Sequence, residues 1–140
     1  MFTPGKTTPR FGEIRLGYFE PENVPSGTHR YVGIHPYLII SNDVYNRTSG
    51  QCEAIAFTTK RFGKHNPVHV DFPVGEVDGL YRPSTLAVES RLTAKNFHFS
   101  EPIGEFSAEN WKKAVPAIMT QNPILSYISD SSLKPEPVFA

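Results

Sequence analysis

Four apolar residues stand in a row at positions 37–40, between the pair His35 and Pro36 and the segment "SNDVYNRTSG". A short apolar run bounded by turn residues is typical of a buried β-strand. We therefore expect a strand over residues 36–41 that ends in a turn. The histidine then stands at the base of this strand, so a group that can exchange a proton lies at the end of a buried element.

Four other segments indicate a mainly β protein. Residues 11–20 begin with apolar and polar residues in alternation, which predicts a half-buried strand. Residues 53–59, 66–72 and 84–90 are short strand-like runs separated by turn residues. Residues 21–33 carry two prolines and two glycines, and they predict a long loop of the kind that often serves function. The spacing suits a small barrel or sandwich.

Helix signals occur only near the end of the chain. Ser107 is a suitable cap for a helix over "AENWKKAV", and Glu109 lies in its first turn, where the helix dipole favours a negative charge. Pro116 is expected to break or kink this helix. We predict one domain over residues 11–122, with an N-terminal arm over 1–10 and a loosely held tail over 123–140.

The composition limits the classes of function. No apolar run approaches the roughly 20 residues of a membrane helix, and no secretory signal is present, so we expect a cytoplasmic protein that does not enter a membrane. Cys52 is the single cysteine, so no internal disulfide forms and the fold depends on its core. Fourteen basic and fourteen acidic residues cancel, so nucleic-acid binding requires a local patch.

Such a patch is found at the ends of the two most strand-like segments. If these strands pair, the groups that converge are His29, Arg30, His35, Thr58, Thr59, Lys60, Arg61 and Lys64. An imidazole, hydroxyls and fixed positive charges suit phosphodiester cleavage, because RNA carries its own nucleophile in the 2′-hydroxyl. The other interpretation is a solvated basic turn at "TTKRFGKH" with His35 as a packed loop residue.

The histidines do not suggest a metal site. None of the five falls into the H-x-x-E-H spacing of zinc proteins, so we expect neither a metal nor another cofactor. His69 alternates with Val68 and Val70, which predicts that it lies on the solvent face of a strand.

The order of these segments resembles that of the MazF/PemK-type toxins. The resemblance runs from about Phe11 to Phe106 and is carried by "GEIRLGYFEP", "HPYLIISNDVYNRTSG", "AIAFTTKR", "NPVHVDF", "STLAVESRLT" and "PIGEF". It implies a small SH3-like barrel of the CcdB/MazF/PemK type with a C-terminal helix, assembled as a homodimer. It also implies a toxin of a type II toxin–antitoxin system, a metal-independent, sequence-selective endoribonuclease for single-stranded RNA that a cognate antitoxin blocks.

The chain departs from this family at one informative position. Members commonly carry an arginine before the proline and a Thr or Ser at the end of the next strand; Thr58 matches, but His35 replaces the arginine. The resemblance therefore makes His35 a catalytic candidate as general acid or base, Thr58 a hydrogen-bond donor to the phosphate, and Arg30 the charge stabiliser.

The expected RNA contacts are His29, Thr59, Lys60, Arg61, Lys64 and Glu89. For Glu89 the alternative is a surface salt-bridge partner. Two other functions stay open at this point. One is a binding protein of the same fold, catalytically inactive or a gyrase poison of the CcdB kind. The other is an SH3-like interaction module with an aromatic groove formed by Tyr18, Tyr31 and Tyr37.

Overall fold

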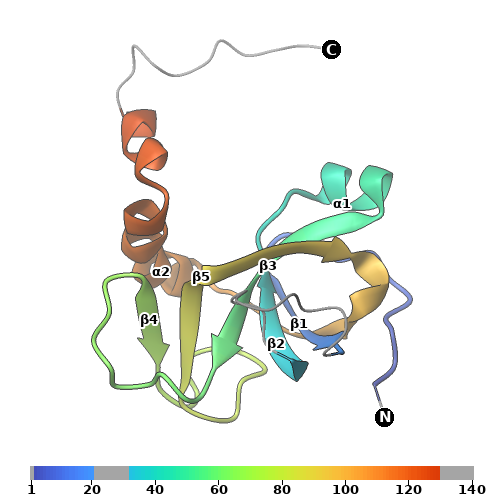
Figure 1. The fold of residues 1–140 in the computed structure, drawn as a ribbon, viewed down its shortest axis with the longest axis horizontal. Coiled ribbons are helices and arrows are strands. Elements are labelled where there is room, and N and C mark those ends of the chain that lie inside the picture. Colours follow the sequence, from blue (N-terminus) through green and yellow to red (C-terminus); the bar gives the residue numbers. More distant parts are fainter. Residues whose placement is uncertain (1, 21–31, 130–140) are drawn as a thin grey trace.

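The computed structural model describes residues 2–20 and 32–129, in which six strands form one antiparallel sheet of order β4-β5-β3-β2-β1-β6 (Figure 1). The strands are β1 (Glu13–Phe19), β2 (Gly33–Ile39), β3 (Gln51–Thr58), β4 (His69–Phe72), β5 (Ser84–Lys95) and β6 (Phe99–Glu105). The helices are α1 (Asp43–Ser49) and α2 (Ala108–Gln121), with 3-10 turns η2 (Asn96–His98) and η3 (Pro123–Ser129).

The predicted mainly β architecture with a C-terminal helix is confirmed. Helix α2 packs against β4 and β5 (Figure 1). The sheet curls as a barrel does, but in the described residues no ladder joins its edge strands β4 and β6, so it is not closed. None of the helices in this part of the chain is long and apolar enough to cross a membrane.

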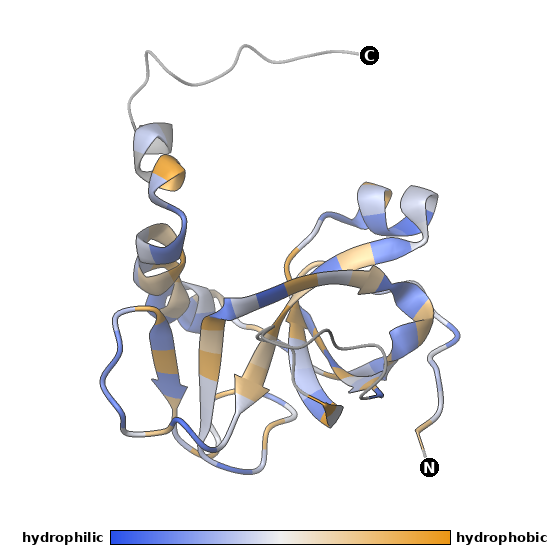
Figure 2. Cartoon of the chain, viewed as in Figure 1, coloured by the Kyte–Doolittle hydropathy of each residue, from blue (hydrophilic) through white to orange (hydrophobic). Residues whose placement is uncertain are grey.

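The central strands are apolar in runs because the sheet buries both of its faces. Along β2, Leu38 belongs to the core cluster beneath α2, whereas Tyr37 and Ile39 belong to a second cluster on the opposite face. In the same way, β3 sends Phe57 to the first cluster and Ala56 to the second. Figure 2 shows apolar residues concentrated on the strands rather than on α1. Continuous apolar runs are expected wherever both faces of a strand are covered.

Helix α1 occupies the segment for which a turn was expected, so that prediction is wrong. Its cap is Asn42, whose side chain accepts a hydrogen bond from the Tyr45 amide at 2.8 Å. Asp43 follows in the first turn, and Gly50 ends the helix in the left-handed conformation. These residue types serve equally in turns and at helix ends, so the local sequence does not separate the two structures.

The end of the chain also differs from expectation. Pro116 does not break α2, which continues to Gln121. Ala114 and Ala117 on either side of it are buried against the core, and this packing offsets the backbone hydrogen bond that proline cannot make. Residues 123–129, expected as the start of a loosely held tail, form η3, and residues 130–140 lie outside the described part.

Arg15 joins three separate parts of the structure. Its side chain is only 1% exposed, and it donates at 2.9 Å to the carbonyl oxygens of Thr7 and Ser100. It also donates to the Thr8 carbonyl and pairs with Glu13 at 2.7 Å. A guanidinium has enough donors to bind all of these oxygens at once. Arg15 therefore holds the N-terminal segment against β1 and β6.

We expect Arg15→Ala to lower the free energy of unfolding by about 3–5 kcal/mol, because it removes a buried side chain and leaves Glu13 and the carbonyl oxygens of Thr7 and Ser100 without their partner. The matched control is Arg91→Ala, which removes a partly exposed ion pair with Glu53 and should cost about 1 kcal/mol or less. Urea titrations of both variants followed by circular dichroism provide the measurement. Equal losses in the two variants would contradict the assigned role of Arg15.

Candidate functional site

Pro36 ends the ladder between β2 and β3. The two strands pair through Tyr37, Leu38 and Ile39, and the Ile40 amide donates to the Glu53 carbonyl. Backbone groups alternate in direction along a strand, so even-numbered residues of β2 face β3. Pro36 occupies such a position and has no N–H to donate. The ladder therefore stops there, and the two strands separate beside His35.

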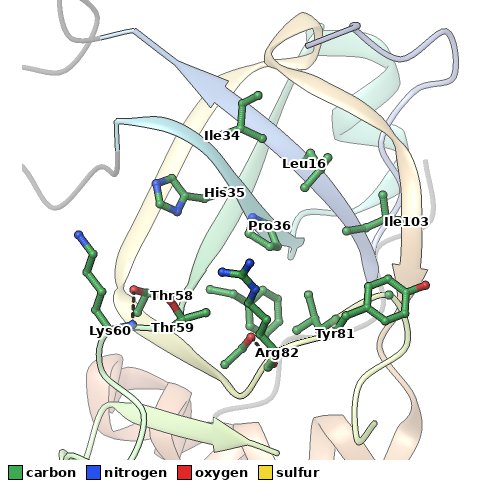
Figure 3. Close-up of a pocket in the computed structure, with 14 residues that line it drawn as sticks. Leu16, Ile34, His35, Pro36, Thr58, Thr59, Lys60, Tyr81, Arg82 and Ile103 are labelled. Carbon is green, nitrogen blue, oxygen red and sulfur yellow. Dashed lines mark hydrogen bonds between the residues drawn. The ribbon is translucent and has the colours of Figure 1, made fainter. Parts of the chain in front are cut away.

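A cavity of about 730 Å³ lies between the separated strand ends (Figure 3). Its charged or ionisable lining groups are His35, Lys60, Tyr81 and Arg82, and no carboxylate of the described residues lines it. The rest of the wall includes apolar side chains such as Ile34 and Ile103. A cavity of this kind suits an anionic ligand that also carries flat apolar groups.

His35 is partly buried at the mouth of this cavity, on the side of Thr58 and Lys60 (Figure 3). Its Nε2 lies 2.9 Å from the carbonyl oxygen of Val32. A carbonyl oxygen only accepts, so Nε2 carries the proton and Nδ1 is the basic atom of the neutral ring. The position thus holds a proton-transfer group in a fixed orientation.

Thr58 is 6% exposed at the end of β3, and its Oγ1 accepts a hydrogen bond from the Lys60 amide at 3.2 Å. This leaves the hydroxyl hydrogen as a donor. Thr58 pairs across the sheet with Thr85, whose Oγ1 donates to Asp71 at 2.7 Å. The pairing with β5 and β4 therefore fixes the position of Thr58.

Two residues that line the cavity were not among the sequence candidates. Figure 3 shows Arg82 beneath Pro36, and Tyr81 on the far side of the cavity from His35. The Tyr81 side chain is 87% exposed. Because Thr85 pairs with Thr58, the loop before β5 must return to the edge of the sheet that carries Thr58. A prediction that the strands pair at Thr58 and Thr85 would have identified both residues.

Thr59 lines the cavity together with His35, whereas Arg61, Lys64 and Glu89 do not. Arg61 and Lys64 line a neighbouring cavity with His69, and Glu89 binds His69 at 2.7 Å, which is the salt-bridge alternative considered for Glu89. The prediction that His69 faces solvent is wrong, since its side chain is only 7% exposed. His29 and Arg30 lie outside the described residues.

Within residues 2–20 and 32–129, no group of three or more His, Cys, Asp or Glu side chains could hold a metal ion. Burial raises the pKa of the Cys52 thiol to about 12, which the charge of Arg15 opposes and that of Glu53 reinforces. The thiol therefore stays protonated near neutral pH.

Residues 10–121 match the family described as "PemK-like, MazF-like toxin of type II toxin-antitoxin system". The match covers most of the chain, so the protein belongs to this toxin family. A comparison with curated protein sequences found no match.

Solved structures share the fold at low sequence identity. An endoribonuclease in complex with its cognate antitoxin from a mycobacterial species is 22% identical, with a TM-score of 0.62, over 92% of this chain and 99% of that one. MazF from Deinococcus radiodurans is 18% identical, with a TM-score of 0.65, over 84% and 99%. The Mycobacterium tuberculosis toxin MazF-mt6 is 18% identical, with a TM-score of 0.61, over 79% and 96%.

Proposed function

We propose that this protein is the toxin of a toxin–antitoxin pair and cleaves single-stranded RNA in the His35 cavity without a metal ion. The observation that carries the proposal is the convergence of His35, Thr58, Lys60 and Arg82 on one cavity that no described carboxylate lines. Membership of the PemK/MazF family supports it, as does the fold shared with an endoribonuclease and with MazF. The expected location of such a protein is the cytoplasm.

The chemistry uses the nucleophile that RNA itself supplies. The 2′-oxygen attacks the neighbouring phosphorus and the P–O5′ bond breaks, giving a 2′,3′-cyclic phosphate and a 5′-hydroxyl. One proton must leave the 2′-hydroxyl and one must reach the 5′-oxygen. His35 acts as the base or the acid in one of these transfers. Thr58 donates a hydrogen bond to the phosphate, while Lys60 and Arg82 neutralise the charge that develops on its oxygens.

A histidine before Pro36 supplies more than the arginine that is usual in this family. An arginine there stabilises charge but does not exchange protons near neutral pH, whereas an imidazole does both. Arg82 compensates for the permanent charge that is lost, and Arg30 stays a second candidate for that role.

The interaction-module alternative is less well supported. Its aromatic groove required Tyr37, which is fully buried, and Tyr31, which lies outside the described residues. A binding-only toxin of the same fold is the outcome that the following experiment would establish if cleavage is not observed.

We expect His35→Ala to reduce cleavage by about 10²- to 10⁴-fold with little change in RNA binding. His35→Arg separates proton transfer from charge stabilisation, because retained activity would mean that the position supplies charge alone. Thr58→Ala should cost less, since it removes one hydrogen bond. Rates are measured on a fluorescent single-stranded RNA, with circular dichroism to verify folding. Parental activity in all three variants, or no cleavage by the parent, would refute the proposed mechanism.

Arg82→Ala tests whether Arg82, which was not among the sequence candidates, stabilises the charge on the phosphate. Loss of a charged hydrogen bond to phosphate should lower kcat/KM by roughly tenfold to a hundredfold. The log–log dependence of RNA affinity on salt should become shallower by about 0.7, the contribution of one phosphate contact on a single strand. Lys112→Ala, an exposed cation of α2 outside the cavity, is the control. An unchanged slope in Arg82→Ala would exclude phosphate contact by Arg82.

The proposal extends to assembly. We expect a symmetric homodimer, the commonest closed arrangement, which a cognate antitoxin inhibits by covering the cavity. Multi-angle light scattering at micromolar concentration should report twice the mass of the 15.7 kDa chain. A monomer at all concentrations tested would contradict this expectation.

A further inference from the structure

A second hollow lies next to the His35 cavity along the chain. Lys60 lines the first cavity, and from Arg61 onward the same loop lines two adjoining cavities of about 540 and 680 Å³. Both of these contain Lys64, His65 and His69, and together they are called the His69 cavity below. An extended ligand in the first cavity that crosses Lys60 would enter the second.

The His69 side chain in this cavity is buried, and only one of its two ring nitrogens has a hydrogen-bond partner among the described residues. Its Nε2 lies 2.7 Å from Oε1 of Glu89, and because a carboxylate only accepts, Nε2 carries the proton. Its Nδ1 is then an acceptor, and it is buried without a hydrogen-bond partner among the described residues. The same holds for Oε2 of Glu89. A buried polar atom without a partner is costly, so a donor that reached Nδ1 would stabilise this arrangement.

The cations around His69 are available to an anion. Arg61 and Lys64 are exposed and make no ion pair within the part of the chain that the structure describes. Asp71 lines the same cavity, but its two oxygens already accept from Thr85 and from the Gly63 amide. The loop over residues 59–68 itself carries Lys60, Arg61 and Lys64 and no carboxylate, so the loop presents net positive charge.

From this arrangement we infer that the His69 cavity is a second subsite for the RNA strand, which binds a ribose-phosphate unit outside the linkage that is cleaved. Arg61 and Lys64 bind the phosphate, and Nδ1 of His69 accepts a hydrogen bond from the 2′-hydroxyl. A 2′-hydroxyl is the group that distinguishes RNA from DNA. Glu89 is a positioning residue, because it holds the ring through Nε2. The inference rests on the proposed function for the identity of the strand.

The phosphate contact is tested by binding rather than by cleavage. Fluorescence anisotropy compares a labelled 12-nucleotide RNA with a trinucleotide, for the parent and for Arg61→Ala/Lys64→Ala. The double variant should bind the long RNA about tenfold more weakly, with a salt slope lower by about 1.4 if each cation contacts one phosphate, and the trinucleotide equally well. Arg47→Ala/Lys112→Ala, two exposed cations outside both cavities, should change neither affinity. Unaltered binding of the long RNA by the Arg61 and Lys64 variant would overturn the inference.

The hydroxyl contact is tested by the ratio of RNA to DNA affinity for the same sequence. His69→Ala should lower this ratio about fivefold, the effect of one hydrogen bond, whereas Glu89→Gln should retain most of it because an amide oxygen still accepts from Nε2. Equal losses for RNA and DNA would show that His69 is structural only. If His69→Ala fails to fold, the Arg61→Ala/Lys64→Ala variant still tests whether the second subsite exists. Trinucleotide cleavage by the parent tests the proposed function separately, since it does not require the second subsite.

Discussion

The absence of one backbone N–H, at Pro36, is the constraint on which the arrangement of the site depends. A central strand normally pairs along its whole length on both sides, and β2 pairs with β1 from Gly33 to Leu38. On the other side its pairing with β3 begins only at Tyr37. The sheet is thus continuous where it carries the core and open where it carries His35. The cavity that results lies beside the first hydrophobic cluster, whose Phe57 and Leu80 form part of its wall.

The neighbouring elements keep this opening in place. Thr58 is fixed through Thr85 and Asp71, so the end of β3 is braced by β5 and β4 rather than by β2. On the other side, β1 continues past the opening and is tied by Arg15 to the N-terminal segment and to β6. The strands on both sides of the cavity are therefore held in place by neighbouring elements. This gives the functional groups the fixed geometry that catalysis requires.

The sequence predicted β1 to β4 and the first half of β5 because they are short apolar runs with clear boundaries, and it placed His35 and Thr58 at adjoining strand ends. It missed β6, most of whose residues are exposed. The prediction failed where a residue type is equally common in two kinds of local structure. Asn42 and Gly50 serve turns and helix caps equally, so α1 was missed. His69 was misplaced because its side chain binds Glu89 of the neighbouring strand β5 and is buried there, which alternation along β4 alone does not reveal. Arg82 lies far from His35 in sequence, and only the Thr58–Thr85 pairing brings it close.

The net charge of the chain is zero, but in the folded structure the acidic and basic side chains are distributed unevenly. Among the described residues, carboxylates pair with Lys or Arg in Arg10–Asp43, Arg15–Glu13, Arg91–Glu53, Lys112–Glu109 and Lys113–Glu76. In contrast, Lys60, Arg61, Lys64 and Arg82 make no ion pair among the described residues. They follow one another from one cavity to the next. A chain without net charge can therefore present a positive track to a polyanion, because its own acids neutralise other cations.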